Sequence, residues 1–228
     1  MKNIEIWQEI LPDIKLLEDI FVIHNFRNFD RKLESQNQTK KYETKIIKFS
    51  QINEMRLYIC PFAFFGTIAH AIIWIKLKDW SEICISREAQ LQQWKERQIL
   101  QSLQSWYRAI VLRASFEDMF GLRCIRKEKI IWYKLNIDLD NMIYITNIFC
   151  QTTNEVNNKY TKYNLFDKNC VSGIWNKIYK KYNLSKYTYW LIFTRFLPNI
   201  LLSKKYIYPN TYQIKFDTKW KNLVKFEI

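Results

Sequence analysis

Residues 68–77, IAHAIIWIKL, form the most strand-like run of the chain. β-branched and aromatic side chains dominate this run, as they do in buried strands. A short turn follows, and residues 82–86, EICIS, predict an antiparallel partner strand. Further strand-like runs lie at 22–29, 46–49, 56–60, 109–113, 129–135 and 213–216. Residues 138–160 predict a helix with Asp138 as its N-cap. The sequence therefore predicts an α+β fold, with helices packed against a mostly antiparallel sheet.

Residues 1–23 predict an amphipathic helix that packs on the rest of the protein. Their apolar residues recur at helical spacing: Ile4, Trp7, Ile10, Leu11, Ile14, Leu17 and Phe21. Acidic residues such as Glu9 and Asp13 interrupt this stretch, so it lacks the apolar centre of a signal peptide. No window of the sequence is long and apolar enough to span a bilayer. Residues 24–228 are expected to form a single domain.

The composition excludes several classes of protein. Of the 228 residues, 48% are hydrophobic, which excludes a disordered tail, and three glycines are too few for a Gly-rich phosphate loop or a dinucleotide fingerprint. The net charge of +14 suits an anionic membrane surface, but the basic residues form no block, so nucleic acid is not an expected partner. The five cysteines have neither disulfide nor zinc spacing, so no cofactor or metal is predicted. No feature of the sequence predicts an oligomeric state.

Cys170 is the cysteine whose surroundings favour chemistry. The other four lie in apolar runs and are expected to be small core residues: Cys60, Cys84, Cys124 and Cys150. Cys170 follows Asn169, and residues 170–182 predict a helix. If Asn169 caps that helix, the sulfur lies in its first turn, where backbone N–H groups and the helix dipole favour the thiolate. The chain has only two histidines, and His70 lies on the strand 68–77, which makes it the candidate base.

A papain-type site needs a cysteine at a helix N-terminus, a histidine on a sheet strand and a polar residue that fixes the imidazole. Glu88, at the end of the neighbouring strand, is the candidate for the third part. The oxyanion would meet the backbone N–H of Cys170, helped by the Asn169 amide. Because His70 precedes Cys170 in the chain, the core would be circularly permuted papain-like, or NlpC-like. The alternative is structural, with His70 a satisfied core residue and Glu88 a solvated charge.

Five short segments carry a family resemblance: HNFRNF at 24–29, TIAH at 67–70, ISREA at 85–89, YRAIVLRASFEDMFGLR at 107–123 and YNLFDKNC at 163–170. In order and separation they resemble the periplasmic N-terminal domain of the Lnb-type bacterial lipoprotein N-acyltransferases. The resemblance runs from about His24 to Pro209, most of the chain. It implies that Cys170 is the nucleophile, His70 its base and Glu88 the third member of a triad.

The resemblance also implies an activity. The thiol would take an acyl chain from a phospholipid as a thioester and pass it to the free α-amine of a lipid-modified lipoprotein. Arg27 matches a family position and is expected to hold an acidic group or a lipid phosphate, or else to form a structural ion pair. Phe62, Phe64 and Phe65 are expected to contact acyl chains, whereas core packing is the expected role of Trp74.

The chain departs from the family pattern in three places, which bear on substrate choice. Val171 and Ser172 follow the cysteine where hydroxyl residues are usual, Ser115 and Phe116 replace acidic residues, and Gln90 replaces a basic one. Two alternatives therefore stay open. One is a cysteine peptidase or amidase on the same fold, and the other is a non-catalytic basic protein that binds a membrane surface or nucleic acid. The resemblance indicates the cell envelope and peripheral membrane contact, although the chain starts without an export signal.

Overall fold

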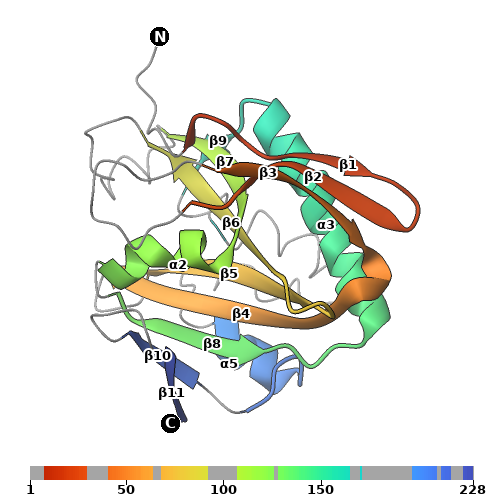
Figure 1. Ribbon diagram of the computed structural model, residues 1–228. Helices are drawn as coiled ribbons and strands as arrows, with labels where there is room; N and C mark the ends of the chain where they lie inside the picture. The colour runs from red at the N-terminus through yellow and green to blue at the C-terminus, as the bar shows by residue number, and fades with distance from the viewer. Residues whose placement is uncertain are drawn as a thin grey trace.

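The computed structural model describes residues 8–29, 41–63, 68–91, 107–125, 128–164, 170, 197–209, 212–216 and 223–227. Their strands are β1 (Asp13–Leu16), β2 (Ile20–Arg27), β3 (Tyr42–Lys48), β4 (Ile52–Ala63), β5 (Ile68–Leu77), β6 (Glu82–Gln90), β7 (Tyr107–Ala114), β8 (Ile130–Lys134), β9 (Lys162–Tyr163), β10 (Tyr212–Phe216) and β11 (Leu223–Glu227). The helices are α2 (Phe116–Ile125), α3 (Leu139–Asn158), α5 (Leu197–Ser203) and the short 3₁₀ helix η2 (Phe49–Gln51). Figure 1 shows one large sheet flanked by these helices.

Within the described residues, the sheet runs in the order β1-β2-β7-β6-β5-β4-β8-β10-β11, with β3 on β2 and β9 on β7. Every pairing is antiparallel except that of β2 with β7, which meet in parallel at Arg27 and Ala114. The predicted mixture of helices with a mostly antiparallel sheet is therefore confirmed. The permuted papain-like arrangement is not confirmed, because the segment predicted to form the helix after Cys170 lies outside the described residues.

Two apolar layers cover opposite faces of the central strands. Ile73 and Ile75 of β5 belong to a large core that includes Phe149 of α3. Ile72, the neighbour of Ile73 on the same strand, belongs to a smaller core that includes Phe120 of α2. Because successive side chains of a strand point to opposite faces, α3 and α2 lie on opposite sides of the sheet. This double burial explains why β5 is apolar at almost every position.

The N-terminal segment forms strands where the sequence predicts an amphipathic helix. β1 and β2 form an antiparallel hairpin, and β3 pairs with the other edge of β2. Along β2, Phe21 and Ile23 are buried while His24 is exposed, which is the alternation of a strand. Asn154 of α3 also binds both the N–H and the carbonyl of Ile14 through its side chain. Such tertiary pairing overrides weak helical periodicity, and the predicted boundary at residue 24 falls inside β2.

Other elements agree with their sequence patterns more closely. β5 and β6 form the predicted antiparallel pair around a turn at residues 78–81. α3 begins after Asp138, whose carboxylate accepts a hydrogen bond from the backbone N–H of Asn141 at 2.8 Å. α2 is not predicted by the sequence pattern. Its start is fixed by Ser115, whose Oγ accepts a hydrogen bond from the N–H of Asp118 at 3.3 Å. Cys124, which the sequence places in an apolar strand-like run, consequently lies in a helix.

No helix in the described part of the chain is long and apolar enough to cross a membrane. The segments 91–106 and 170–182 lie outside the described residues, apart from Leu91 and Cys170.

Candidate active site

Three neighbouring strands bring the predicted base and its predicted partner into one row. Cys60 of β4 lies opposite His70 of β5. The pairing of β5 with β6 ends at Ile72 and Ser86, and extending this antiparallel register by two residues leads to His70 and Glu88, whose side chains are in contact. These side chains share the face of the sheet that α2 covers. The sheet register therefore delivers Glu88 to the imidazole without any loop.

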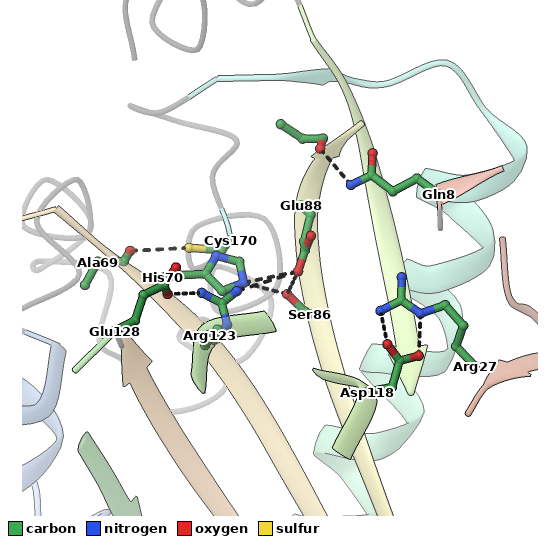
Figure 2. Close-up of polar contacts among 11 residues, drawn as sticks. Gln8, Arg27, Ala69, His70, Ser86, Glu88, Asp118, Arg123, Glu128 and Cys170 are labelled. Carbon is green, nitrogen blue, oxygen red and sulfur yellow. Dashed lines mark hydrogen bonds and ion pairs between the residues drawn. The ribbon is translucent and has the colours of Figure 1, made fainter. Parts of the chain in front are cut away.

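His70 is buried, and its Nε2 atom contacts two side chains of β6. Nε2 lies 2.6 Å from Ser86 Oγ and 3.6 Å from Glu88 Oε1. Ser86 Oγ in turn donates a hydrogen bond to Glu88 Oε1 at 3.0 Å. Figure 2 shows Ser86 and Glu88 reaching the imidazole from the same strand. Sequence reasoning named Glu88 but missed Ser86, although its place two residues earlier puts both side chains on one face of the strand.

Arg123 of α2 contacts the same carboxylate oxygen of Glu88 as His70. Its Nη2 lies 3.8 Å from Glu88 Oε1, and its Nη1 donates to Glu128 Oε2 at 3.0 Å. Burial alone would lower the pKa of Arg123, but the acidic groups of Cys60, Glu88 and Glu128 outweigh burial and raise that pKa. The guanidinium therefore stays charged between the two carboxylates. Sequence reasoning missed Arg123 and Glu128, because only the packing of α2 brings them to β6.

Cys170 lies against the backbone of β5, next to His70. Its Sγ donates a hydrogen bond to the carbonyl oxygen of Ala69 across 3.7 Å, and the residue is 5% exposed. Figure 2 shows the sulfur and the imidazole at the same end of this strand. The fold thus brings the predicted nucleophile to the strand that carries the predicted base, from 101 residues away in the sequence. Asn169, the predicted oxyanion donor, lies outside the described residues.

Three other cysteines are buried free thiols, as predicted from their apolar surroundings: Cys60, Cys84 and Cys150. Burial raises the pKa of Cys60 to about 12 and that of Cys84 well above its ordinary value. Burial also raises the pKa of Cys150, against the opposing effect of Arg113. These sulfurs are protonated near neutral pH, when cysteine is a weak nucleophile.

Arg27 forms a buried ion pair with Asp118, which joins β2 to α2. Its Nε lies 2.7 Å from Asp118 Oδ2 and its Nη2 lies 3.1 Å from Oδ1, the geometry of a two-pronged guanidinium–carboxylate contact. The N–H of Ser115 also donates to the carbonyl of Arg27 at 2.9 Å. Of the roles considered for Arg27, the structure shows an ion pair with an acidic group. Figure 2 shows this pair apart from the imidazole, so its effect on the site passes through the position of α2.

The aromatic residues considered for acyl contact divide into two groups. The side chains of Phe62, Phe64 and Phe65 lie outside the described part of the structure. Trp74 is buried in the core beneath α2, as predicted, with the Arg56 guanidinium 4.3 Å from its ring centroid. Among the described residues, no group of three or more His, Cys, Asp or Glu side chains could hold a metal ion.

Comparison with known proteins places the site inside a recognised domain. Residues 38–188 match the model of the Lnb N-terminal periplasmic domain. The match spans most of the chain and contains His70, Glu88, Arg123 and Cys170, whereas Arg27 precedes it. No curated protein and no solved structure matches the chain significantly. The extent of the match shows that the chain belongs to the family of the Lnb N-terminal periplasmic domain.

Proposed function

We propose that this protein is a cysteine-dependent acyltransferase that works through a thioester acyl-enzyme. The observation that carries the proposal is the position of Cys170 Sγ against the Ala69 carbonyl, at the residue before His70. The contacts of His70 with Ser86 and Glu88 support it, because they give a base whose orientation is held from one side. Membership of the Lnb family supports a relation to lipoprotein processing.

In the proposed first half-reaction, His70 takes the proton of the Cys170 thiol, and the thiolate attacks the carbonyl carbon of an acyl ester. The tetrahedral oxyanion binds the backbone N–H of Cys170 and the amide of Asn169. When the ester C–O bond breaks, the imidazolium returns its proton to the departing alkoxide. The products are a free alcohol and an acyl thioester on Cys170. Glu88 stabilises the imidazolium while it exists.

In the second half-reaction, a neutral α-amine attacks the thioester carbonyl. His70 accepts the proton that the amine loses, and the C–S bond breaks to give an amide. The imidazolium then returns a proton to the thiolate, which restores the Cys170 thiol. The same base thus serves both halves, and no further reactant is consumed.

The proposed donor is a phospholipid, and the proposed acceptor is the N-terminal amine of a lipid-modified lipoprotein. The net charge of +14 supports contact with anionic head groups, and the family description supports a periplasmic location. The proposal includes a circularly permuted papain-like core, because in such a core the histidine on a strand comes before the cysteine in the sequence.

The test uses vesicles of a phospholipid with a labelled acyl chain, plus a short diacylglyceryl-cysteine peptide with a free α-amine. We expect a mass increase of one acyl group on Cys170 that hydroxylamine removes, followed by the label appearing on the peptide as an amide. Cys170→Ala should abolish both signals. Cys84→Ala is the matched control and should keep both, because burial holds Cys84 as a thiol.

Other outcomes would overturn specific parts of the proposal. Transfer that survives Cys170→Ala would remove the thioester. Release of the label to water at the same rate with or without the acceptor would make the protein a hydrolase, and cleavage of a fluorogenic peptide at Cys170 would make it a peptidase. If an acyl chain of the lipopeptide itself moved to its own α-amine in detergent without phospholipid, the lipopeptide would be the acyl donor. The proposed acyl-enzyme on Cys170 would still stand. Salt-sensitive vesicle binding alone, unchanged by Cys170→Ala, would favour a non-catalytic role.

A further inference from the structure

We infer that Ser86 is the positioning residue of the site: its hydroxyl bridges His70 Nε2 to Glu88 and decides which ring nitrogen carries the proton. The catalytic meaning of this inference rests on the proposed function. Its structural content rests on the contacts among three side chains of β5 and β6 alone.

The direct contact between base and carboxylate is too long to do this work. His70 Nε2 lies 3.6 Å from Glu88 Oε1, beyond an ordinary N–H···O hydrogen bond, but only 2.6 Å from Ser86 Oγ. Ser86 and His70 are 1% and 3% exposed, so this link is shielded from solvent. Buried polar groups need internal hydrogen bonds, and the serine hydroxyl supplies the link.

The number of protons available determines which atom donates in each of these hydrogen bonds. A serine hydroxyl has one proton, and here it points to the Glu88 carboxylate at 3.0 Å. Ser86 Oγ can therefore only accept from His70, so Nε2 must carry hydrogen. A neutral imidazole has a single N–H, which leaves Nδ1 as its basic atom. In the proposed reaction, Nδ1 is then the atom that takes the proton of Cys170.

One carboxylate lies beside the imidazole and is linked to it by the serine hydroxyl. Among the described residues, Glu88 of β6 contacts the imidazole directly, and Cys60 of β4 lies opposite His70. Arg123 of α2 contacts Glu88 and Glu128, and Cys170 contacts the carbonyl oxygen of the neighbouring Ala69. Glu88 is the carboxylate that contacts the imidazole, so its negative charge stabilises an imidazolium when one forms in the proposed reaction. The serine bridge transmits this charge, because the Nε2–H of the imidazolium keeps an acceptor that is itself bonded to Glu88.

The test is nitrogen NMR of histidine side chains, which suits a chain with only two histidines. His24 is exposed on β2 and serves as the internal reference. We expect neutral His70 to be the Nε2–H tautomer in the natural protein. In Ser86→Ala it should become a mixture of tautomers, while His24 is unchanged. Ser86→Thr keeps the hydroxyl and should keep the natural tautomer.

Acyl transfer is measured on the same variants. Loss of a hydrogen bond to a charged group predicts a rate about 10- to 100-fold lower in Ser86→Ala, with Ser86→Thr closer to the natural protein. An Nδ1–H tautomer in the natural protein, or a tautomer indifferent to Ser86→Ala, would overturn the inference even if acyl transfer occurs. A tautomer that responds as expected in a protein without acyl transfer would uphold the bridge and overturn the proposed function instead.

Discussion

Cys60 and Cys170 both lie beside β5, but we expect only Cys170 to act as a nucleophile. Cys60 lies opposite His70 but has a pKa of about 12, because it is fully buried. Cys170 lies at the end of β5 that carries the imidazole. We expect iodoacetamide at pH 8 to label Cys170 well before Cys60 or Cys84, as read by peptide mass spectrometry. Equal labelling of Cys170 and Cys60, or labelling of Cys170 that ignores His70→Ala, would contradict the proposed pair.

The variant Glu88→Gln tests whether the negative charge of Glu88 supports the proposed reaction through His70. Glu88→Gln keeps the size of the side chain and an acceptor oxygen for Ser86 but removes the negative charge near His70. We expect acyl transfer to fall about 10-fold or more, because the imidazolium loses its stabilising charge. The unfolding temperature should change little. Normal turnover by Glu88→Gln would remove Glu88 from the proposed site.

Glu43 lies on β3, away from the site, and should make the unfolding free energy of the protein depend on pH. Hydrogen bonds from Lys41 and Asn28, together with Lys45, lower the pKa of Glu43 from 4.5 to about 2. A lowered carboxyl pKa stabilises the fold fully above the unfolded value and loses that effect as the pH falls toward 2. Because Lys41 is largely exposed, the contribution is only about 0.5–1 kcal/mol. Urea unfolding of Glu43→Gln should show this deficit at pH 7 and a shrinking deficit between pH 4.5 and 2. If the loss of stability in Glu43→Gln did not change with pH, it would come from altered packing and not from the charge of Glu43.

At the scale of elements, the Arg27–Asp118 pair joins α2 to β2. Both side chains are almost fully buried. Asp118→Asn leaves the Arg27 guanidinium buried without its counter-charge, so we expect a loss of about 3–5 kcal/mol in unfolding free energy. Lys134→Ala, which breaks a contact between a half-exposed lysine and Glu54, is the control and should cost under about 1 kcal/mol.

The double variant Arg27→Met with Asp118→Leu separates charge from position. Replacing both members of a buried pair by apolar residues is often neutral, so we expect much of the lost stability to return. Since α2 carries Arg123 to Glu88, acyl transfer should recover with the stability. Destabilisation of the double variant equal to that of Asp118→Asn would show that the geometry of the pair matters, not the stranded charge.

At the scale of the whole molecule, the fold extends beyond the segment that matches the family. β2 places Phe21, Ile23 and Phe26 in the core, and α5 contributes Leu197 and Leu201. All of these lie outside residues 38–188. We expect a fragment of residues 38–188 to unfold at a clearly lower temperature than the full chain and to bind a hydrophobic dye, because apolar core surface becomes exposed. A cooperative transition at the temperature of the full chain would contradict this.

Strands buried on both faces were the most predictable elements. β5 is apolar at nearly every position, so its pattern admits few alternatives, and the Asp138 cap marks the start of α3. β1 and the first residues of β2 were mispredicted as helix because their apolar residues also fit helical spacing, and only pairing with β3 and contact with α3 select the strand. The rest of β2 lies in the predicted strand-like run 22–29. α2 was not predicted because it is short and its contacts, such as Asp118 with Arg27, come from residues far away in the sequence.

The sequence alone determined the chemistry on offer: one cysteine outside the apolar runs, two histidines and an acidic residue at the end of the strand beside His70. Local pattern suffices for such statements, because residue type and strand alternation are properties of neighbours in the chain. Only the tertiary structure decided that Cys170 contacts β5 and that Ser86 lies between His70 and Glu88. The same holds for the contact of Arg123 with Glu88. These contacts depend on sheet register and helix packing, which the burial of two apolar layers sets for the whole molecule at once.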